Sequence, residues 1–225
     1  MTQTEYKIYI DRIIERIEKA RIGVSEHHIV KIIAVSKYVD SHAVQSLYEI
    51  GQRAFGENKV QDLKSKMDAL EALPLEWHFI GTLQKNKINQ LIDLDPFMMQ
   101  SLHSLELAEA LDKRLEAKGR TMECLLQINS AGEETKSGVM PEEAADVYAQ
   151  IAETCPRIDL RGVMSIGAHT EETSVVQKSF ETTRSIFDAL GGAEVCSMGM
   201  SGDFELAIAC GSTMVRLGSV LFPEA

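Results

Sequence analysis

The sequence lacks the features that mark exported and membrane proteins. Its four cysteines are widely spaced without a CxxC pair, and none of its 225 residues belongs to a run of 18 apolar residues. Such cysteines indicate reduced thiols, and the missing apolar run argues against a membrane helix. The polar and charged N-terminus does not fit a secretory signal. We therefore expect a cytoplasmic protein.

Positive charge is also scarce, above all in the second part of the chain. The sequence has 23 Lys and Arg against 34 Asp and Glu, a net charge of −11. Residues 101–225 contain 10 of these basic residues and 20 of the acidic ones. An acidic surface repels phosphate backbones, so nucleic acid is not an expected partner. Arg216 is the only basic residue from Ser185 to the C-terminus, which sets it apart.

Several common catalytic motifs are absent. The chain has no GxxxxGK[ST] phosphate loop, no GxGxxG turn, no HExxH zinc motif and no GxSxG nucleophile turn. His27 and His28 are adjacent, point apart on most backbones and are interpreted as a solvated pair. The sequence therefore gives no support for a hydrolase, a kinase or a metalloenzyme, and no metal site is expected.

What the sequence does contain is an alternation of short apolar runs and longer helical stretches. Isoleucines at helical spacing predict an amphipathic helix over residues 4–22. Residues 32–35 form a continuous apolar run, which is typical of a strand covered on both faces. Further strands are expected to begin near Ala54, Trp77, Met98, Met122, Leu160, Val195 and Met214. Helices are expected between them, including 41–51, 58–71, 104–118 and 141–154, the last starting at Pro141.

Eight strands separated by helix-sized segments predict a parallel sheet with crossover helices. In 225 residues the pattern favours a single α/β TIM-type (β/α)₈ barrel with an extra N-terminal helix. The alternative, an open doubly wound sheet, is expected to have a glycine-rich turn after its first strand, where Ser36-Lys37-Tyr38 stands instead. No linker or low-complexity segment divides the chain, so we expect one domain over residues 1–225.

Function in such barrels lies at the C-terminal ends of the strands and in the loops that follow. Lys37 follows four apolar residues at the end of the first strand. A lysine at this position ordinarily extends to solvent, but over an apolar barrel mouth it can also form a Schiff base with an aldehyde. The position alone leaves both interpretations open.

Two glycine-rich segments, 199–203 and 216–219, end the seventh and eighth strands. Structural turns would explain either segment alone. The backbone N–H groups after Ser201 and the close approach that Gly218 permits also suit an anion. The loops after strands seven and eight are the recurrent phosphate site of these barrels. Together with Lys37, the two segments fit a phosphorylated aldehyde.

Six blocks of the sequence resemble, in order, conserved blocks of the YggS/PROSC family of pyridoxal-phosphate homeostasis proteins, which are similar in fold to the N-terminal barrel of alanine racemase. The blocks are residues 33–37, 55–58, 77–81, 160–164, 197–203 and 211–218. The resemblance covers essentially the whole chain. It departs from the family pattern at Thr82, where proline is frequent, and in the tail 222–225, which lacks a glycine and a basic residue.

The resemblance implies that the cofactor is pyridoxal 5′-phosphate (PLP), with Lys37 as the Schiff-base lysine. It also implies that Arg216 faces the pyridine nitrogen and that Asn58 lies beside the ring or the imine. The phosphate would be held by Ser201 and by the backbone at Gly202, Gly218 and Ser219. Ser212 and Thr213 precede the eighth strand, at the opposite end of the barrel from Gly218, and are expected to have a structural role. The role of Lys136, in the loop 134–138, stays open.

Arg216 bears on whether the protein catalyses a reaction. A guanidinium is a permanently charged donor, so a ring nitrogen that faces it stays unprotonated and the ring is a weaker electron sink. Racemases of this fold add an acid/base group from a second domain, which we do not expect here. The first hypothesis is therefore a monomeric carrier that binds PLP with little or no catalysis and delivers it through transient contacts with apo PLP enzymes. The alternatives are a small amino-acid racemase, with Tyr38, His169 or a neighbouring loop as second base, and a barrel that has lost the cofactor and acts through protein contacts.

Overall fold

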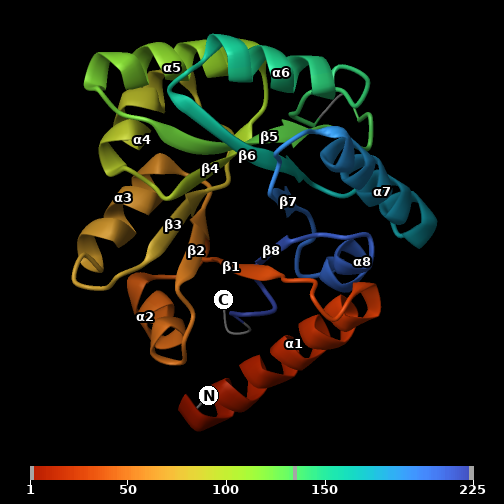
Figure 1. The fold of residues 1–225 in the computed structure, drawn as a ribbon. Helices are drawn as coiled ribbons and strands as arrows, with labels where there is room; N and C mark the ends of the chain where they lie inside the picture. The colour runs from red at the N-terminus through yellow and green to blue at the C-terminus, as the bar shows by residue number, and fades with distance from the viewer. Residues whose placement is uncertain (1–2, 134–135, 223–225) are drawn as a thin grey trace.

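The computed structural model describes residues 3–133 and 136–222, which form a closed barrel of parallel strands surrounded by helices (Figure 1). The strands pair in sequence order, and β8 pairs with β1 to close the ring. The predicted (β/α)₈ barrel is thus confirmed, and the open sheet is wrong. The strands are β1 (Lys31–Val35), β2 (Ala54–Glu57), β3 (Glu76–Phe79), β4 (Met98–Leu102), β5 (Met122–Ile128), β6 (Ile158–Ser165), β7 (Val195–Ser197) and β8 (Met214–Leu217).

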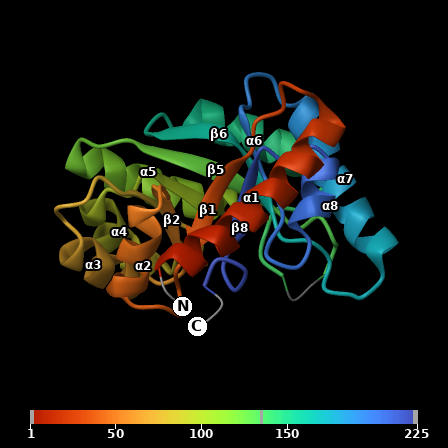
Figure 2. The same cartoon turned by 90° about the horizontal axis from the view of Figure 1, so that it is seen from below.

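The helices cover the outside of the barrel. They are α1 (Gln3–Val24), α2 (Ser41–Glu49), α3 (Val60–Ala69), α4 (Ile88–Leu94), α5 (Leu105–Lys118), α6 (Ala144–Thr154), α7 (Thr173–Ala189) and α8 (Phe204–Ala209), with a short 3₁₀ helix, η1 (Lys85–Lys87), before α4. Helices α2 to α8 each follow a strand, whereas α1 precedes β1 and lies beside α8 (Figure 2). Arg16 of α1 forms an ion pair with Glu205 of α8, with Nε 2.7 Å from Oε1.

The sequence explains where most of these helices begin and end. In α5, Ser104 Oγ accepts from the Leu107 N–H, and Gly119 ends the helix with a φ of 63° that favours glycine. The expected start of α6 at Pro141 is wrong. Residues 141–143 form a turn in which the Glu143 N–H donates to the Met140 carbonyl, and α6 begins at Ala144. A tight turn thus precedes the helix that Pro141 was expected to start.

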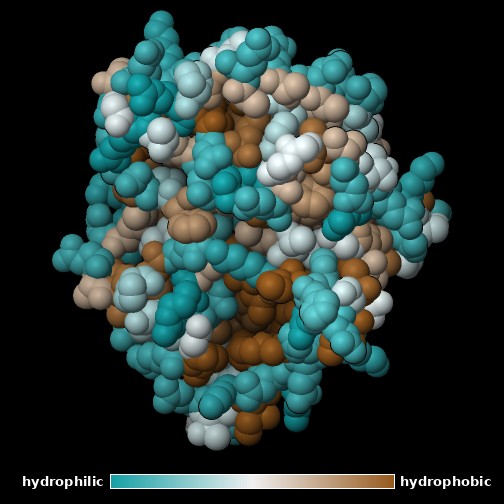
Figure 3. Space-filling model, in the orientation of Figure 1, coloured by the Kyte–Doolittle hydropathy of each residue, from teal (hydrophilic) through white to brown (hydrophobic). Residues whose placement is uncertain are grey.

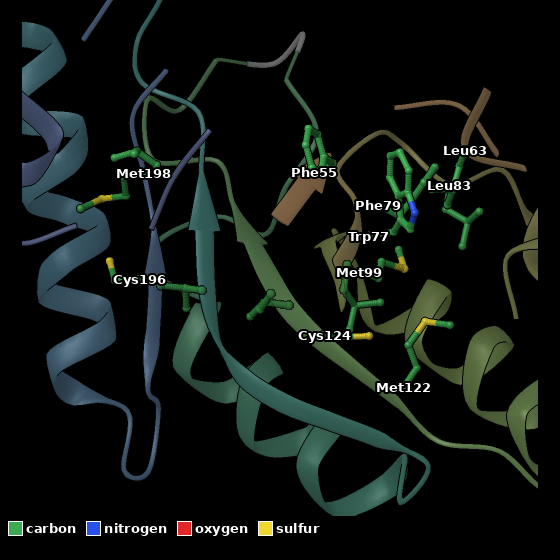
Figure 4. Packing of buried hydrophobic residues seen from close by; sticks show 14 of the residues in the cluster. Phe55, Leu63, Trp77, Phe79, Leu83, Met99, Met122, Cys124, Cys196 and Met198 are labelled. Atoms are coloured by element: carbon green, nitrogen blue, oxygen red, sulfur yellow. The ribbon is translucent and has the colours of Figure 1, made fainter. Parts of the chain in front are cut away.

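The core has two layers because successive strand residues face opposite sides of the barrel wall. Residues that face outward pack against the helices; Trp77, Phe79 and Met99 do so near Leu63 of α3 (Figure 4). The Phe55 ring lies 5.8 Å from that of Trp77. Two small apolar clusters occupy part of the barrel interior; they are formed by Ile33, Ala54 and Met214 and by Met98, Leu125 and Met164.

The four cysteines are free, and three of them, Cys124, Cys155 and Cys196, are buried in the core. Cys210 is half-buried. Burial raises the pKa of Cys196 to about 12, so this thiol stays protonated at neutral pH.

The ring of helices is open between α1 and α2, where an apolar hollow is visible (Figure 3). Its lining comes from α1, β1, α2 and the C-terminal segment, and consists of Ile10, Ile13, Ile14, Ile32, Leu47, Ile50, Gly51, Gln52 and Leu221. In the described part of the chain, no helix has both the length and the apolar composition needed to cross a bilayer.

Candidate functional site

The structure brings the seven predicted site residues to one end of the barrel. They lie in or directly after β1, β2, β7 and β8, which are consecutive around the closed ring. Register places Ile33 of β1 opposite Arg216 of β8. Because all strands are parallel, their C-terminal ends and the loops that follow form one mouth. Here we call this end of the barrel the mouth.

Lys37 lies in the turn after β1 with an exposed side chain. Its Nζ is 4.8 Å from the centre of the Tyr38 ring, which is itself 81% exposed. The turn is held by the Val39 N–H, which donates to the Ser36 carbonyl at 3.0 Å. The backbone at Lys37 is therefore fixed, while its amine is accessible from solvent.

Asn58 follows β2 and is half-buried against the loop after β3. Gly81 packs directly on its backbone, because a Cβ placed on Gly81 would lie 2.0 Å from the Asn58 carbonyl oxygen. No side chain fits at that distance. Gly81 thus determines how closely the β2 and β3 loops approach each other beside Asn58.

We expect Gly81→Ala to displace Asn58 and to weaken cofactor binding, because backbone atoms cannot yield as a flexible side chain would. Thermal unfolding of the variant and a PLP titration measure the two effects. Gly119→Ala is a useful control, since a Cβ at Gly119 meets nothing within 4 Å. Its only expected loss of stability comes from the backbone strain of an alanine at the positive φ of 63°. Equal PLP affinity in Gly81→Ala and wild type would contradict this role of Gly81.

The loops after β7 and β8 meet at the Ser201 hydroxyl. Ser201 Oγ accepts from the backbone N–H groups of Gly218, at 3.1 Å, and Val220, at 3.3 Å. Gly202 is exposed, and a Cβ there would meet nothing within 4 Å. Two amides that converge on one oxygen next to an open glycine provide the donors that a phosphate needs. The Val220 amide was missed in the sequence, because a backbone donor has no residue-type signature.

Arg216 is a buried cation, only 4% exposed, inside the mouth. Its Nη1 donates to the Ser197 carbonyl at 2.9 Å and to Ser197 Oγ at 2.6 Å, and its Nη2 donates to the Ser165 carbonyl at 2.8 Å. Burial lowers the pKa of Arg216 to about 10, so it stays protonated at neutral pH. Within residues 3–133 and 136–222, no carboxylate forms an ion pair with it. Such a cation suits a ligand that brings an acceptor atom into the mouth.

A chain of hydrogen bonds continues from Arg216 through the barrel interior. Ser197 Oγ donates to Gln100 Oε1 at 2.8 Å, and Gln100 Nε2 donates to His78 Nδ1 at 3.1 Å. Since Nδ1 accepts, the Nε2–H of His78 is the donor to Glu76 Oε1, at 3.2 Å. Every bond in this chain thus runs in the same direction, from the guanidinium toward a carboxylate.

That carboxylate, Glu76, also accepts from Lys31 at the opposite end of the barrel. The hydrogen bond from His78, together with Lys31, lowers the pKa of Glu76 to about 2. Burial lowers the pKa of His78, which keeps its ring neutral and preserves the direction of the chain. The His78 side chain is itself fully buried inside the barrel. Polar residues at inward positions of otherwise apolar strands are the signal that could have revealed the chain.

Ser212 and His28 lie in the segments before β8 and β1 and contact each other. Ser212 Oγ lies 2.8 Å from the Met198 carbonyl oxygen and 2.9 Å from that of Met214. These hydrogen bonds to the backbone give Ser212 a structural role. The interpretation of His28 as solvated is wrong, because it is half-buried and its Nε2 lies 2.8 Å from the Ser212 carbonyl; His27 is exposed.

Lys136 Nζ donates to Glu133 at 2.7 Å and to the Gly167 carbonyl at 3.0 Å, so it is not a purely solvated lysine. Thr82 is exposed. Residues 134–135 of the Lys136 loop and tail residues 223–225 lie outside the described residues. The described residues contain no cluster of three His, Cys, Asp or Glu side chains suited to a metal ion.

Comparisons with known proteins identify the family to which the chain belongs. Residues 8–224 match the family described as alanine racemase, N-terminal domain. A pyridoxal phosphate homeostasis protein of Helicobacter pylori (strain J99) is 58% identical over 220 residues, which are 98% of this chain and 99% of the relative. PipY of Synechococcus elongatus PCC7942, solved with PLP bound, superposes with a TM-score of 0.78 at 31% identity, over 92% of this chain and 99% of PipY.

Similarity to complete alanine racemases is limited to the fold. The enzyme of Clostridium difficile 630 is 18% identical with a TM-score of 0.73, and the match covers 93% of this chain but only 55% of the enzyme. The match to the H. pylori protein, by contrast, spans nearly the full length of both chains. The chain therefore belongs to the alanine racemase N-terminal domain family and, within it, to the pyridoxal phosphate homeostasis proteins.

Proposed function

We propose that this protein binds PLP at the mouth of the barrel and acts in the homeostasis and delivery of the cofactor. The observation that carries the proposal is the grouping of an accessible amine, a pair of convergent amides and a buried cation on neighbouring strands. Lys37, the Ser201 loop and Arg216 supply these three features. The PLP bound to PipY and the names of the curated relatives support it.

Each group has a different part in binding. Lys37 holds the cofactor through a Schiff base at its amine, and Asn58 lies beside the ring. Arg216 donates to the ring nitrogen. Ser201 and the backbone of Gly202, Gly218, Ser219 and Val220 hold the phosphate. When bound, PLP supplies an electrophilic aldehyde and an electron-accepting ring.

We infer that the protein catalyses little or no reaction, because Arg216 is a charged hydrogen-bond donor. It stays protonated at neutral pH and has no proton-accepting atom, so it can hold the ring nitrogen only as an acceptor. The ring is then a poor electron sink, which suits storage better than turnover. Tyr38 and His169, the second bases that a racemase would need, are both exposed, and no geometry in the described residues favours them.

Delivery requires that a recipient reach the cofactor. The exposed Lys37 and Tyr38 at the mouth support transfer to apo PLP enzymes through transient contacts. We infer that residues 1–225 work as one PLP-binding domain, as a monomer, in the cytoplasm.

The test is an absorption spectrum of the purified protein with PLP, before and after borohydride, followed by peptide mapping. We expect a trapped adduct on Lys37. Racemisation, transamination and decarboxylation of common amino acids are assayed on the same sample. No adduct would favour a barrel that acts through protein contacts, and turnover above about 1 s⁻¹, the low end for typical enzymes, would favour the racemase.

A further inference from the structure

A buried ion pair lies directly behind the mouth, outside the barrel wall. Lys66 of α3 forms an ion pair with Glu57 Oε1, and its Nζ also donates to the Ser36 carbonyl at 2.5 Å. Ser36 Oγ donates to the same Oε1 at 2.7 Å. The Glu57 side chain is fully buried and that of Lys66 is 10% exposed. We call Glu57 and Lys66 the clamp pair.

The clamp pair joins the ends of two strands to one helix. Ser36 ends the extended run of β1, and its N–H donates to the Gly56 carbonyl of β2 at 3.0 Å. Glu57 ends β2, and its carbonyl accepts from the Ile80 N–H at 2.9 Å. The next residue after Ser36 is Lys37, and the next after Glu57 is Asn58. Each residue held by Lys66 is therefore followed directly by a residue of the proposed cofactor site.

Stability alone does not account for this arrangement. The buried face of α3 consists of Val60, Leu63 and Lys66, so a lysine occupies a place in an apolar stripe. Buried ion pairs replaced by apolar residues of similar volume often leave stability unchanged or raise it. In addition, Glu57 Oε2 is buried without a partner among the described residues, which adds a desolvation cost.

We propose that Glu57 and Lys66 are positioning residues that hold the Ser36 carbonyl and the end of β2, so that the Lys37 amine and Asn58 approach the cofactor together. This inference rests on the proposed function. The Lys66 amine is itself engaged by Glu57 and the Ser36 carbonyl, so it acts through Lys37 and does not compete with it for the aldehyde.

The test replaces the clamp pair by two methionines, Glu57→Met with Lys66→Met. We expect the Tm to stay within about 5 °C of wild type, because the apolar pair compensates for the lost charges. The rate at which Lys37 captures PLP, followed by stopped-flow absorbance, is expected to fall about 10-fold to 100-fold, the effect of a small misplacement of a reacting group. Non-covalent affinity, measured with Lys37→Ala added to both proteins, is expected to change far less.

A matched control removes an ion pair at the other end of the barrel. Lys118 at the end of α5 pairs with Asp93 near the end of α4, and Lys118→Met is expected to leave the capture rate unchanged. Glu57→Gln is the conservative variant: it keeps an acceptor for Ser36 and Lys66 but removes the charge, and we expect an intermediate fall in rate.

The outcomes separate the two proposals. A folded methionine variant that captures PLP at the wild-type rate overturns the positioning role. If that variant does not fold, Glu57→Gln decides, and an unchanged rate again overturns it. If wild-type protein forms no adduct on Lys37, the proposed function itself has failed.

Discussion

Lys37→Ala is expected to form no borohydride-stable adduct with PLP and still to bind the cofactor non-covalently. The side chain of Lys37 is exposed and makes no hydrogen bond in the described part of the chain, so its loss removes little packing. We expect a Tm within about 2 °C of wild type, as for ordinary surface substitutions. Phosphate capture uses a hydroxyl and backbone amides that this change does not touch, so equilibrium dialysis should detect residual binding.

Ser201→Ala is the matched variant at the other end of the ligand. It removes a hydroxyl that accepts from the Gly218 and Val220 amides and that is expected to donate its own proton to the phosphate. We expect PLP affinity to weaken by about 1–3 kcal/mol, the usual cost of a lost hydrogen bond to a charged group, while the adduct still forms at high PLP.

The adduct's position in wild-type protein decides the assignment. Peptide mapping that finds it on Lys85, Lys87 or Lys136 would overturn Lys37 as the attachment site. The structure gives Lys85 and Lys136 carboxylate partners, Glu106 and Glu133, which makes them poorer candidates than the exposed Lys37.

The fold could be predicted from the sequence because its signals are local. Eight apolar runs separated by amphipathic segments leave few architectures, and each expected strand lies within two residues of its observed start. The start of α6 could not be predicted in this way. Pro141 is compatible with a first helical turn and with a tight turn, and the choice depends on hydrogen bonds around Met140 that the sequence does not display.

The site could be predicted in part, for the same reason. Lys37 and the glycine segments are visible once strand ends are known, and the family resemblance assigns their roles. The chain from Arg216 to Glu76 is different, because it joins residues far apart in the sequence, such as Ser197 and Gln100. Only the closed ring places β4 and β7 across one interior, so no local pattern reveals their contact.

The position of Lys66 could be predicted from the sequence, but its partner could not. Its place in the apolar stripe of α3 can be seen from helical spacing, and a lysine there indicates a buried partner. The partner, Glu57, is polar at the end of an otherwise apolar strand. Which carboxylate lies behind which lysine is fixed only by the packing of α3 on β1 and β2.

Arg216→Glu is also expected to have a large effect, both on the absorption spectrum of bound PLP and on the stability of the fold. An anion facing the ring nitrogen favours its protonated form, so the absorption of the complex should change more than in any other site variant that keeps Lys37. Arg216→Lys, which keeps a positive charge, should shift the spectrum much less. The spectra are compared at equal saturation with PLP.

The stability effect follows from what surrounds Arg216. The carbonyls of Ser197 and Ser165 accept from its guanidinium, and a carboxylate in its place would face two acceptors without a donor. We expect the free energy of unfolding at pH 7 to fall by about 3–5 kcal/mol, as for an uncompensated buried charge.

Burial should also raise the pKa of the introduced carboxyl in the folded state above its unfolded value of about 4.3. The folded state then holds the proton that the unfolded state has released, so the stability of Arg216→Glu falls as pH rises between these two pKa values and levels off above them. Urea unfolding from pH 4 to 8 measures this slope against wild type. A spectrum and a pH profile that both match wild type would show that Arg216 neither faces the ring nor depends on the carbonyls of Ser165 and Ser197.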